Sequence, residues 1–216
     1  MRSWLDYLRD RRVLGALAVC VLVVATATGV LPLSRLLGLH ARPERWTEAR
    51  PGWLFRSAQI PAADVADVLH DMRIDVVLDL TDDAPDKVRD AEQAAAEKLG
   101  IRYLHLPVEQ PRSVVIANLA TAVAEIERGR QRGDRVLVHC TYGHRRSAAA
   151  LALYARIIEH EPPHVAYAEF ARYADADSTW SRGAQSFIEK NLDDVRAQVM
   201  AELAAPVSAT PVSAAN

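Results

Sequence analysis

Apolar and polar positions alternate along residues 51–200 in a way that predicts strands separated by helices. Short apolar runs, which are typical of buried strands, occur at residues 53–56, 74–80, 102–106 and 135–139, and the run at 74–80 is rich in β-branched residues. Stretches with apolar residues at helical spacing lie between them and predict helices that begin at Pro61, at Pro85 and near Val114. This alternation predicts an α/β fold, with a mainly parallel central sheet flanked by helices.

The N-terminal region has a different pattern, because residues 13–33 contain no charged side chain. This length matches the ~20 residues that cross a bilayer as a helix, so we expect a single-pass transmembrane helix or signal anchor. The basic cluster within the flanking residues 1–12 favours an N-terminus inside and a domain facing the periplasm or the exterior. The alternatives are a buried core helix and a signal peptide cleaved near Ala25-Thr26-Ala27.

Three further segments follow from composition. Residues 34–50 combine Pro43 with many charges and are expected to form a linker. Residues 51–200 are expected to form the folded domain. Residues 201–216 are mostly small and polar with two prolines, which predicts a disordered tail.

Overall composition narrows the classes of function. Half of the residues are apolar and a quarter are charged, as in an ordinary folded domain. The 28 acidic and 26 basic residues give a net charge of −2, so we do not expect a nucleic-acid partner. The two cysteines, Cys20 and Cys140, form no CxxC pair, so neither a disulfide framework nor a structural metal is expected.

The segment after the last predicted strand carries the candidate chemistry. Its pattern is HCxxGxxRS, and its residues are His139-Cys140-Thr141-Tyr142-Gly143-His144-Arg145-Arg146-Ser147. A loop that leads into a helix points backbone N–H groups at an anion, and Gly143 permits the backbone angle that such a turn requires. The fork of Arg146 can bind two phosphate oxygens, and the positive field favours a Cys140 thiolate at neutral pH.

This loop resembles the signature of the cysteine-dependent protein tyrosine phosphatases, closest to their dual-specificity branch and to bacterial members. The resemblance covers residues 51–200 and includes the stretches 53–59 and 101–108. It implies the cysteine phosphatase fold and a phosphocysteine intermediate, without a metal or organic cofactor. The residues implied to bind phosphate are Thr141, Tyr142, Gly143, His144, Arg145 and Arg146.

The resemblance also implies individual roles. Cys140 would be the nucleophile, and Arg146 would stabilise the transition state. Ser147 would support the sulfur as a leaving group, although a Ser at this position can instead cap the following helix. His139 is expected to orient the loop and to tune the thiolate.

The proton donor departs from the family pattern. The enzymes that the chain resembles place an Asp on a loop about thirty residues before the Cys, where it acts as a general acid. The corresponding loop here, residues 106–112, contains no Asp. Its carboxylate is Glu109, which we expect to be the general acid and base, with Asp82 and Asp83 as reserve candidates.

Other readings of the loop remain open. Cys140 and Arg145 also fit the six-residue anion loop of sulfurtransferases, although Gly143 and the Arg146-Ser147 pair fit the phosphatase spacing better. Arsenate reductases with similar loops need additional thiols, and residues 51–200 contain none besides Cys140. A non-catalytic phosphate-binding module is a further alternative, because the Asp is missing.

Phosphotyrosine proteins are the expected substrates, and phospholipid head groups or inositol phosphates are the alternative.

Overall fold

The computed structural model describes residues 42–109, 112–171 and 179–205. Within these ranges, no helix is both long enough and apolar enough to cross a bilayer. The membrane span predicted at residues 13–33 lies outside the described residues, together with the flank before it.

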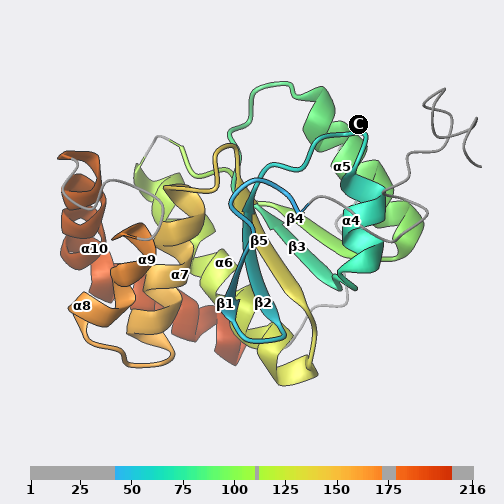
Figure 1. The fold of residues 1–216 in the computed structure, drawn as a ribbon. Coiled ribbons are helices and arrows are strands. Elements are labelled where there is room, and N and C mark those ends of the chain that lie inside the picture. Colours follow the sequence, from blue (N-terminus) through green and yellow to red (C-terminus); the bar gives the residue numbers. More distant parts are fainter. Residues whose placement is uncertain (1–41, 110–111, 172–178, 206–216) are drawn as a thin grey trace, which may run out of the picture. The chain divides into compact units, whose positions relative to one another are not determined.

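A five-stranded sheet forms the centre of the described domain (Figure 1). In spatial order its strands are β1 (Thr47–Arg50), β2 (Leu54–Ala58), β5 (Val136–Cys140), β3 (Val76–Asp79) and β4 (Arg102–His105). β1 is antiparallel to β2, and the other neighbouring strands are parallel. The predicted α/β class with a mainly parallel sheet is therefore confirmed.

Helices cover both faces of this sheet (Figure 1). One face packs against α4 (Val65–Asp71) and α5 (Lys87–Leu99). The other face packs against α6 (Arg112–Arg132), α7 (Arg146–Ile157) and α10 (Thr179–Ala204). Two short helices, α8 (Pro163–Ala166) and α9 (Ala168–Ala171), follow α7 and pack against it.

Successive residues of β5 belong to different cores. Leu137 packs on the α4 and α5 side, whereas Val136 and Val138 pack on the side of α6, α7 and α10. Side chains of a strand alternate between its two faces, so His139 and Cys140 are directed to opposite sides of the sheet. This alternation separates the two reactive side chains of the motif although they are neighbours in sequence.

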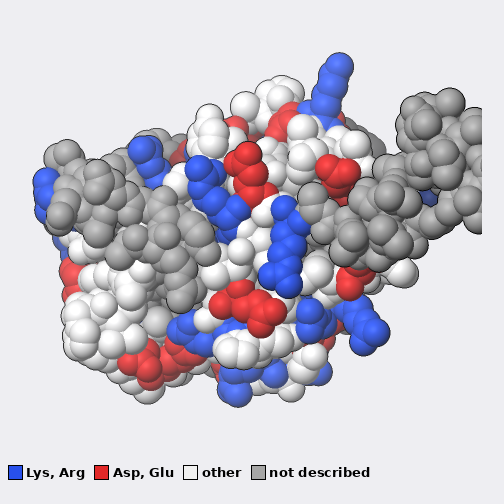
Figure 2. Space-filling view, viewed as in Figure 1, with Lys and Arg blue, Asp and Glu red and all other residues white. Residues whose placement is uncertain are grey.

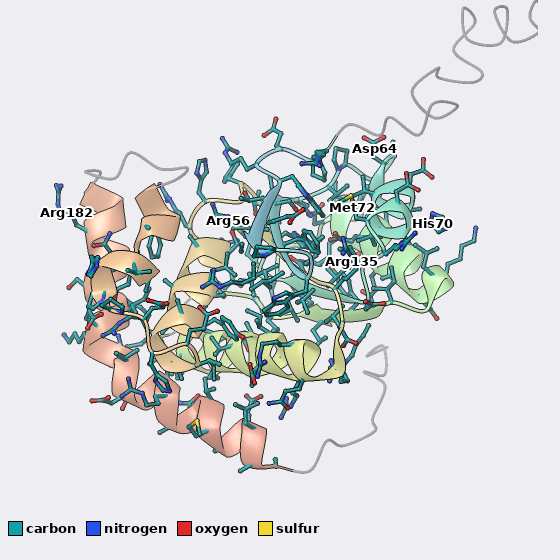
Figure 3. The ribbon with its side chains drawn as sticks, turned by 60° about the horizontal axis from the view of Figure 1, so that its bottom comes forward. Arg56, Asp64, His70, Met72, Arg135 and Arg182 are labelled. Carbon is teal, nitrogen blue, oxygen red and sulfur yellow. The ribbon has the colours of Figure 1, made fainter. Side chains whose placement is uncertain are left out.

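The start of β5 is held by Arg135, which lies beside α4 (Figure 3). Its guanidinium donates to the carbonyl of Met72 at 2.8 Å and to that of Gly52 at 2.5 Å. The same group lies 4.6 Å from the centre of the Phe55 ring. These contacts join β5 to the turn before β2 and to α4, which fixes the strand that leads into the HCxxGxxRS loop.

The predicted helix after Pro85 is confirmed with its two ends. α5 follows Asp86, whose carboxylate accepts a hydrogen bond from the Val88 N–H at 2.8 Å. It ends at Gly100, which has the left-handed φ of 69° expected of a C-terminal cap. The helix predicted at Pro61 begins later, at Val65, because the Pro61 carbonyl accepts turn hydrogen bonds from Asp64 and Val65.

Two boundaries differ from the sequence-based expectation. Thr47–Arg50 form β1, although residues 34–50 are predicted to be a linker. The pairing of this strand shifts between Glu48 and Arg50, so it lacks the regular alternation that identifies a strand in sequence. α10 continues to Ala204, beyond the predicted end near residue 200, because its last turns consist of good helix formers.

Charged side chains are interspersed on the face shown in Figure 2. Several arginines of the described domain are paired with carboxylates. Arg128 lies 2.7 Å from Glu125 and Arg130 lies 2.7 Å from Glu127, both on α6, and Arg50 of β1 pairs with Glu159. The charge of these arginines is thus compensated locally.

Candidate active site

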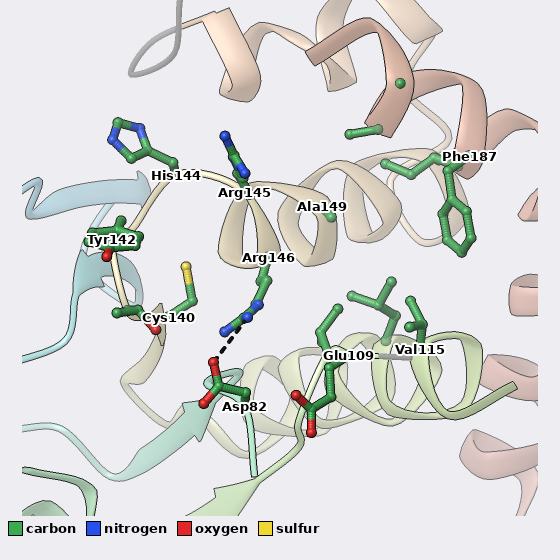
Figure 4. Close-up of a pocket in the computed structure, with 16 residues that line it drawn as sticks. Asp82, Glu109, Val115, Cys140, Tyr142, His144, Arg145, Arg146, Ala149 and Phe187 are labelled. Atoms are coloured by element: carbon green, nitrogen blue, oxygen red, sulfur yellow. Dashed lines mark hydrogen bonds and ion pairs between the residues drawn. The ribbon is translucent and has the colours of Figure 1, made fainter. Parts of the chain in front are cut away.

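The residues of the motif lie where β5 ends and α7 begins (Figure 4). Cys140 is the last residue of β5, and Arg146 is the first residue of α7, so residues 141–145 form the loop between them. Cys140 is buried, and it lines a cavity of about 890 Å³. The loop residues that share this lining are Thr141, Tyr142, His144 and Arg145.

The conformation of the loop requires a glycine at position 143. Its φ is +63°, a region that side chains with a Cβ rarely adopt. A Cβ at this position would lie 2.6 Å from the Ala58 nitrogen and 2.7 Å from the Ser57 carbonyl carbon. Because both contacts are with the backbone of β2, no side-chain movement could relieve them. The predicted reason for a Gly at this position is confirmed, and the close approach to β2 adds a second reason.

The outer side of the loop is tied down by hydrogen bonds to its carbonyl groups. Arg45 donates to the Tyr142 carbonyl at 2.9 Å, and the Gln59 N–H donates to the Thr141 carbonyl at 3.4 Å. On the inner side, the Gly143 N–H donates to the Cys140 carbonyl at 3.2 Å, and the N–H groups of Ser147 and Gly143 both help to lower the pKa of the Cys140 thiol. The loop therefore presents backbone donors at the place where an anion would bind.

The Cys140 thiol is surrounded by groups that favour its ionisation. Its Sγ lies 3.6 Å from the Ser147 Oγ, and Ser147 is itself buried. Burial raises the pKa of Cys140, but the Ser147 N–H, the Ser147 hydroxyl, the charge on His139 and the Gly143 N–H together lower this pKa below its ordinary value. Ser147 does not cap α7, whose N-cap residue is Arg145.

Arg146 projects into the same cavity from the first turn of α7 (Figure 4). Its Nη2 lies 3.3 Å from the Asp82 Oδ2, and its Nη1 donates to the Leu80 carbonyl at 3.4 Å. The loop after β3 thus holds the guanidinium beside the thiol. A planar fork in this place can bind two oxygens of a phosphate group.

The structure separates the three carboxylates that are candidates for the proton donor. Glu109 and Asp82 line the cavity that contains Cys140, whereas Asp83 is not among its lining residues. The Glu109 Oε1 accepts a hydrogen bond from the Asp83 N–H at 3.2 Å, which holds the Glu109 carboxylate at the cavity wall. The Asp83 carboxylate is exposed and lies 3.7 Å from His105.

His139 lies behind the loop, on the face of the sheet that is covered by α5. Its side chain is completely buried, and its Nε2 lies 3.0 Å from the Glu92 Oε2 and 3.7 Å from the Asp79 Oδ1. Burial lowers the pKa of His139, but the charges of Glu92, Asp79 and Cys140 outweigh this effect and raise the pKa to about 9. Sequence reasoning missed Glu92. The available signal was a carboxylate four residues from Val88 and four from Ala96, on the apolar side of a helix.

Asp79, Glu92 and His139 form a group whose spacing could hold a metal ion, judged over the described residues. However, the Asp79 carboxylate already accepts hydrogen bonds from the Thr81 N–H at 2.8 Å, the Thr81 hydroxyl at 3.0 Å and the Tyr103 hydroxyl at 2.8 Å. Its oxygens are directed to these donors. We therefore interpret the group as a buried charge network.

One wall of the cavity is apolar. Side chains from the loop after β4 and from α6, α7 and α10 form this wall, namely Val108, Val115, Leu119, Ala149, Ala184, Phe187 and Ile188. The anion-binding loop lies at one end and the apolar wall at the other. Such an arrangement suits a phosphate monoester of an aromatic or otherwise apolar group.

Comparisons with known proteins agree with this geometry. The profile of the family described as dual specificity phosphatase, catalytic domain, matches residues 58–161. No curated protein matches the chain significantly.

Solved structures share the fold at low sequence identity. Pseudomonas aeruginosa TpbA is 23% identical with a TM-score of 0.53, over 69% of this chain and 87% of its own. PTPMT1 is 19% identical with a TM-score of 0.56, over 72% of this chain and 99% of its own. The core catalytic domain of the PP-IP phosphatase SIW14 from Saccharomyces cerevisiae is 15% identical with a TM-score of 0.57, over 76% and 96%.

The family match runs from the last residue of β2 to just beyond α7, which includes every residue of the HCxxGxxRS loop. The sheet order, the loop at the end of β5 and the lowered pKa of its thiol are consistent with that match. Residues 58–161 are therefore a dual-specificity phosphatase-like catalytic domain, and the protein is a cysteine-dependent phosphatase of the protein tyrosine phosphatase superfamily.

Proposed function

We propose that this phosphatase acts on phosphorylated tyrosine in proteins, with Cys140 as its nucleophile. The observation that carries the proposal is the position of Cys140 and Arg146 at one end of a cavity whose opposite wall is apolar. A phosphotyrosine would place its phosphate in the loop and its ring against the wall. TpbA, which shares the fold, has been solved in complex with pTyr.

The reaction follows from the arrangement of these groups. The Cys140 thiolate attacks phosphorus, and the bond from phosphorus to the ester oxygen breaks as the new sulfur–phosphorus bond forms. Arg146 and the N–H groups of residues 141–146 stabilise the charge on the three remaining phosphate oxygens. Glu109 gives its proton to the leaving oxygen, so that the alcohol or phenol departs neutral.

The second step returns the enzyme to its starting state. Water attacks the phosphorus of the phosphocysteine and loses a proton to Glu109, and inorganic phosphate leaves. The sulfur departs as a thiolate, which the Ser147 hydroxyl at 3.6 Å stabilises. His139 contributes its positive charge from behind the strand. The cycle consumes water and the phosphate ester alone.

A phospholipid head group is the second candidate substrate. The apolar wall would also accept part of a lipid, and PTPMT1 has been solved in complex with PI(5)P. Inositol phosphates with several phosphate groups fit less well, because Asp82 places negative charge in the same cavity.

We also propose that residues 13–33 anchor the enzyme in a membrane as a single-pass helix, with the catalytic domain on the periplasmic or outer side. The support is the uncharged run and the basic cluster before it. The full chain should then remain in membranes washed with alkaline carbonate. Protease added to intact spheroplasts should digest the catalytic domain. Release into the wash would argue for a cleaved signal peptide.

The first experiment is hydrolysis of p-nitrophenyl phosphate by the full chain between pH 5 and 8, beside the variant Cys140→Ser. We expect turnover that is lost in the variant. A phosphotyrosine peptide should then be hydrolysed with a higher kcat/KM than a phosphoserine peptide or a phosphoinositide. A preference for the phosphoinositide would favour the second candidate. Folded protein that binds vanadate without turnover would instead indicate a non-catalytic phosphate-binding module.

A further inference from the structure

Behind the phosphate loop, a second set of ionisable groups is closed off from solvent. The side chains of His139, Glu92 and Asp79 are all 0% exposed, although each can carry a charge. Glu92 comes from the middle of α5, His139 from the end of β5 and Asp79 from the end of β3. None of them lines the cavity that would hold the substrate.

The burial of Glu92 calls for a compensating charge. Removing a carboxylate from water is strongly unfavourable unless an opposite charge or several hydrogen bonds replace the lost hydration. Glu92 faces the core from the side of α5 that also carries Ala96, a position where an apolar residue would suffice for packing. The cationic form of His139, 3.0 Å away, provides this charge.

The two carboxylates have different partners. Asp79 accepts hydrogen bonds from Thr81 and from the Tyr103 hydroxyl, whose pKa is raised by burial and by the charge of Asp79, so Tyr103 remains a donor. The Glu92 oxygens have no such donors among the described residues, and their contact with His139 is an ion pair without good hydrogen-bond angles. The charge of Glu92 is thus directed mainly at the imidazole.

The groups around His139 come from α5, from the neighbouring strands and from its own strand. The charged and titratable groups that face it are Glu92 from α5, Asp79 from β3 and the neighbouring Cys140 on its own strand. Tyr103 and His105 from β4 lie one contact further away, against Asp79. On β2, the residue in register with His139 is Ser57, which is neutral. The two carboxylates favour the imidazolium, and the imidazolium in turn favours the Cys140 thiolate.

We propose that Glu92 is a positioning residue of the reaction, which holds a positive charge on His139 and thereby favours the Cys140 thiolate. The inference rests on the proposed role of Cys140 as the nucleophile. Glu92 contacts neither the cavity nor the reacting atoms, so it acts through His139. Its effect is therefore expected in the ionisation of the thiol and not in the binding of the substrate.

The test compares Glu92→Gln with Glu97→Gln, an exposed carboxamide substitution on the same helix. The rate of Cys140 alkylation by iodoacetamide is measured against pH on the full chain, so the readout needs no turnover. In Glu92→Gln the midpoint should move up by about one pH unit, which corresponds to a roughly tenfold loss of thiolate at low pH. Glu97→Gln should retain the wild-type midpoint.

Kinetics provide the matching readout. In Glu92→Gln, the acid limb of kcat/KM for p-nitrophenyl phosphate should shift to higher pH together with the alkylation midpoint. Glu92→Asp, which keeps the negative charge, should show a smaller shift. A lower melting temperature with an unchanged alkylation midpoint would overturn the proposal, because it would reduce Glu92 to a structural residue. The shift in alkylation with no turnover in either protein would sustain the proposal and contradict the catalytic function.

A measurement on the unmodified chain covers the case in which Glu92→Gln does not fold. The ring nitrogens of His139 are followed by NMR between pH 6 and 10, with Cys140→Ser as the reference for the effect of the thiolate. An imidazole that stays protonated above pH 8 supports the proposal. An imidazole that is neutral at pH 7 overturns it.

Discussion

The Nη2 of Arg146 lies 3.3 Å from the Oδ2 of Asp82, so the guanidinium that would bind phosphate already has an anionic partner. Both side chains are partly exposed, at 28% and 41%. An ion pair of this exposure contributes ~0–1 kcal/mol, which a doubly charged phosphate can readily displace. The pair orients Arg146 without preventing it from binding substrate.

Replacement of Asp82 by Asn tests this relationship. Asn keeps an oxygen that accepts from Arg146 but removes a negative charge from the cavity. We expect KM for p-nitrophenyl phosphate to fall a few-fold, with kcat within about twofold of the wild-type value. Steady-state kinetics at pH 6 check this expectation. A loss of kcat near a hundredfold would instead make Asp82 the general acid.

Replacement of Glu109 by Gln tests the proton donor. We expect kcat to fall by roughly 10²-fold for an ester with a poor leaving group, since an alkoxide cannot depart without a proton. The loss should be smaller for p-nitrophenyl phosphate, whose leaving group needs little assistance. Phosphorylation of Cys140, detected by rapid acid quench and mass measurement, should remain. Equal activity toward both esters in the variant and the wild type would exclude Glu109 from the reaction.

Gly143→Ala should disrupt the phosphate loop through the backbone of β2. The added Cβ would meet the Ala58 nitrogen at 2.6 Å, in addition to the strain of a positive φ. We expect vanadate affinity and turnover to be lost, with a lower Tm.

The matched control for that variant is Gly133→Ala. Gly133 also has a positive φ, of 79°, but a Cβ there would meet nothing within 4 Å. This control should lose only the ~1 kcal/mol of the backbone strain and keep its activity. Retention of vanadate binding by Gly143→Ala would show that the loop can move away from β2.

Ser147→Ala should change the pH dependence of the reaction. The Ser147 hydroxyl is one of the groups that lower the pKa of Cys140, so its removal raises that pKa. Because the thiolate is the reactive form, activity is lost as pH falls through the pKa of Cys140, and the loss in the variant should begin at a higher pH. The acid limb of kcat/KM measures the shift.

The second step gives an independent readout for the same variant. Without the hydroxyl, the sulfur is a poorer leaving group, so phosphocysteine should accumulate and a burst of p-nitrophenol should precede the steady state. If the variant shows neither a shifted acid limb nor a burst, Ser147 has only a packing role.

Much of this protein could be read from local sequence. The strand at residues 135–139, Gly143 and the pair Arg146-Ser147 form a contiguous unit whose chemistry depends on the order of neighbouring residues. The same holds for Gly100 as the end of α5, because helix ends are determined by nearby residues. The strand at Thr47–Arg50 could not be predicted from local sequence, since its place in the sheet depends on pairing with β2.

Only the tertiary structure decided which distant residues join the loop. Asp82 reaches Arg146, and Glu92 reaches His139, because the parallel strands β3 and β5 end at the same edge and α5 packs across them. Such contacts depend on the register of strands and the rotation of a helix, which no local pattern encodes. The sequence by itself thus determined the HCxxGxxRS loop and the strand that leads into it, whereas packing determined the charges that surround them.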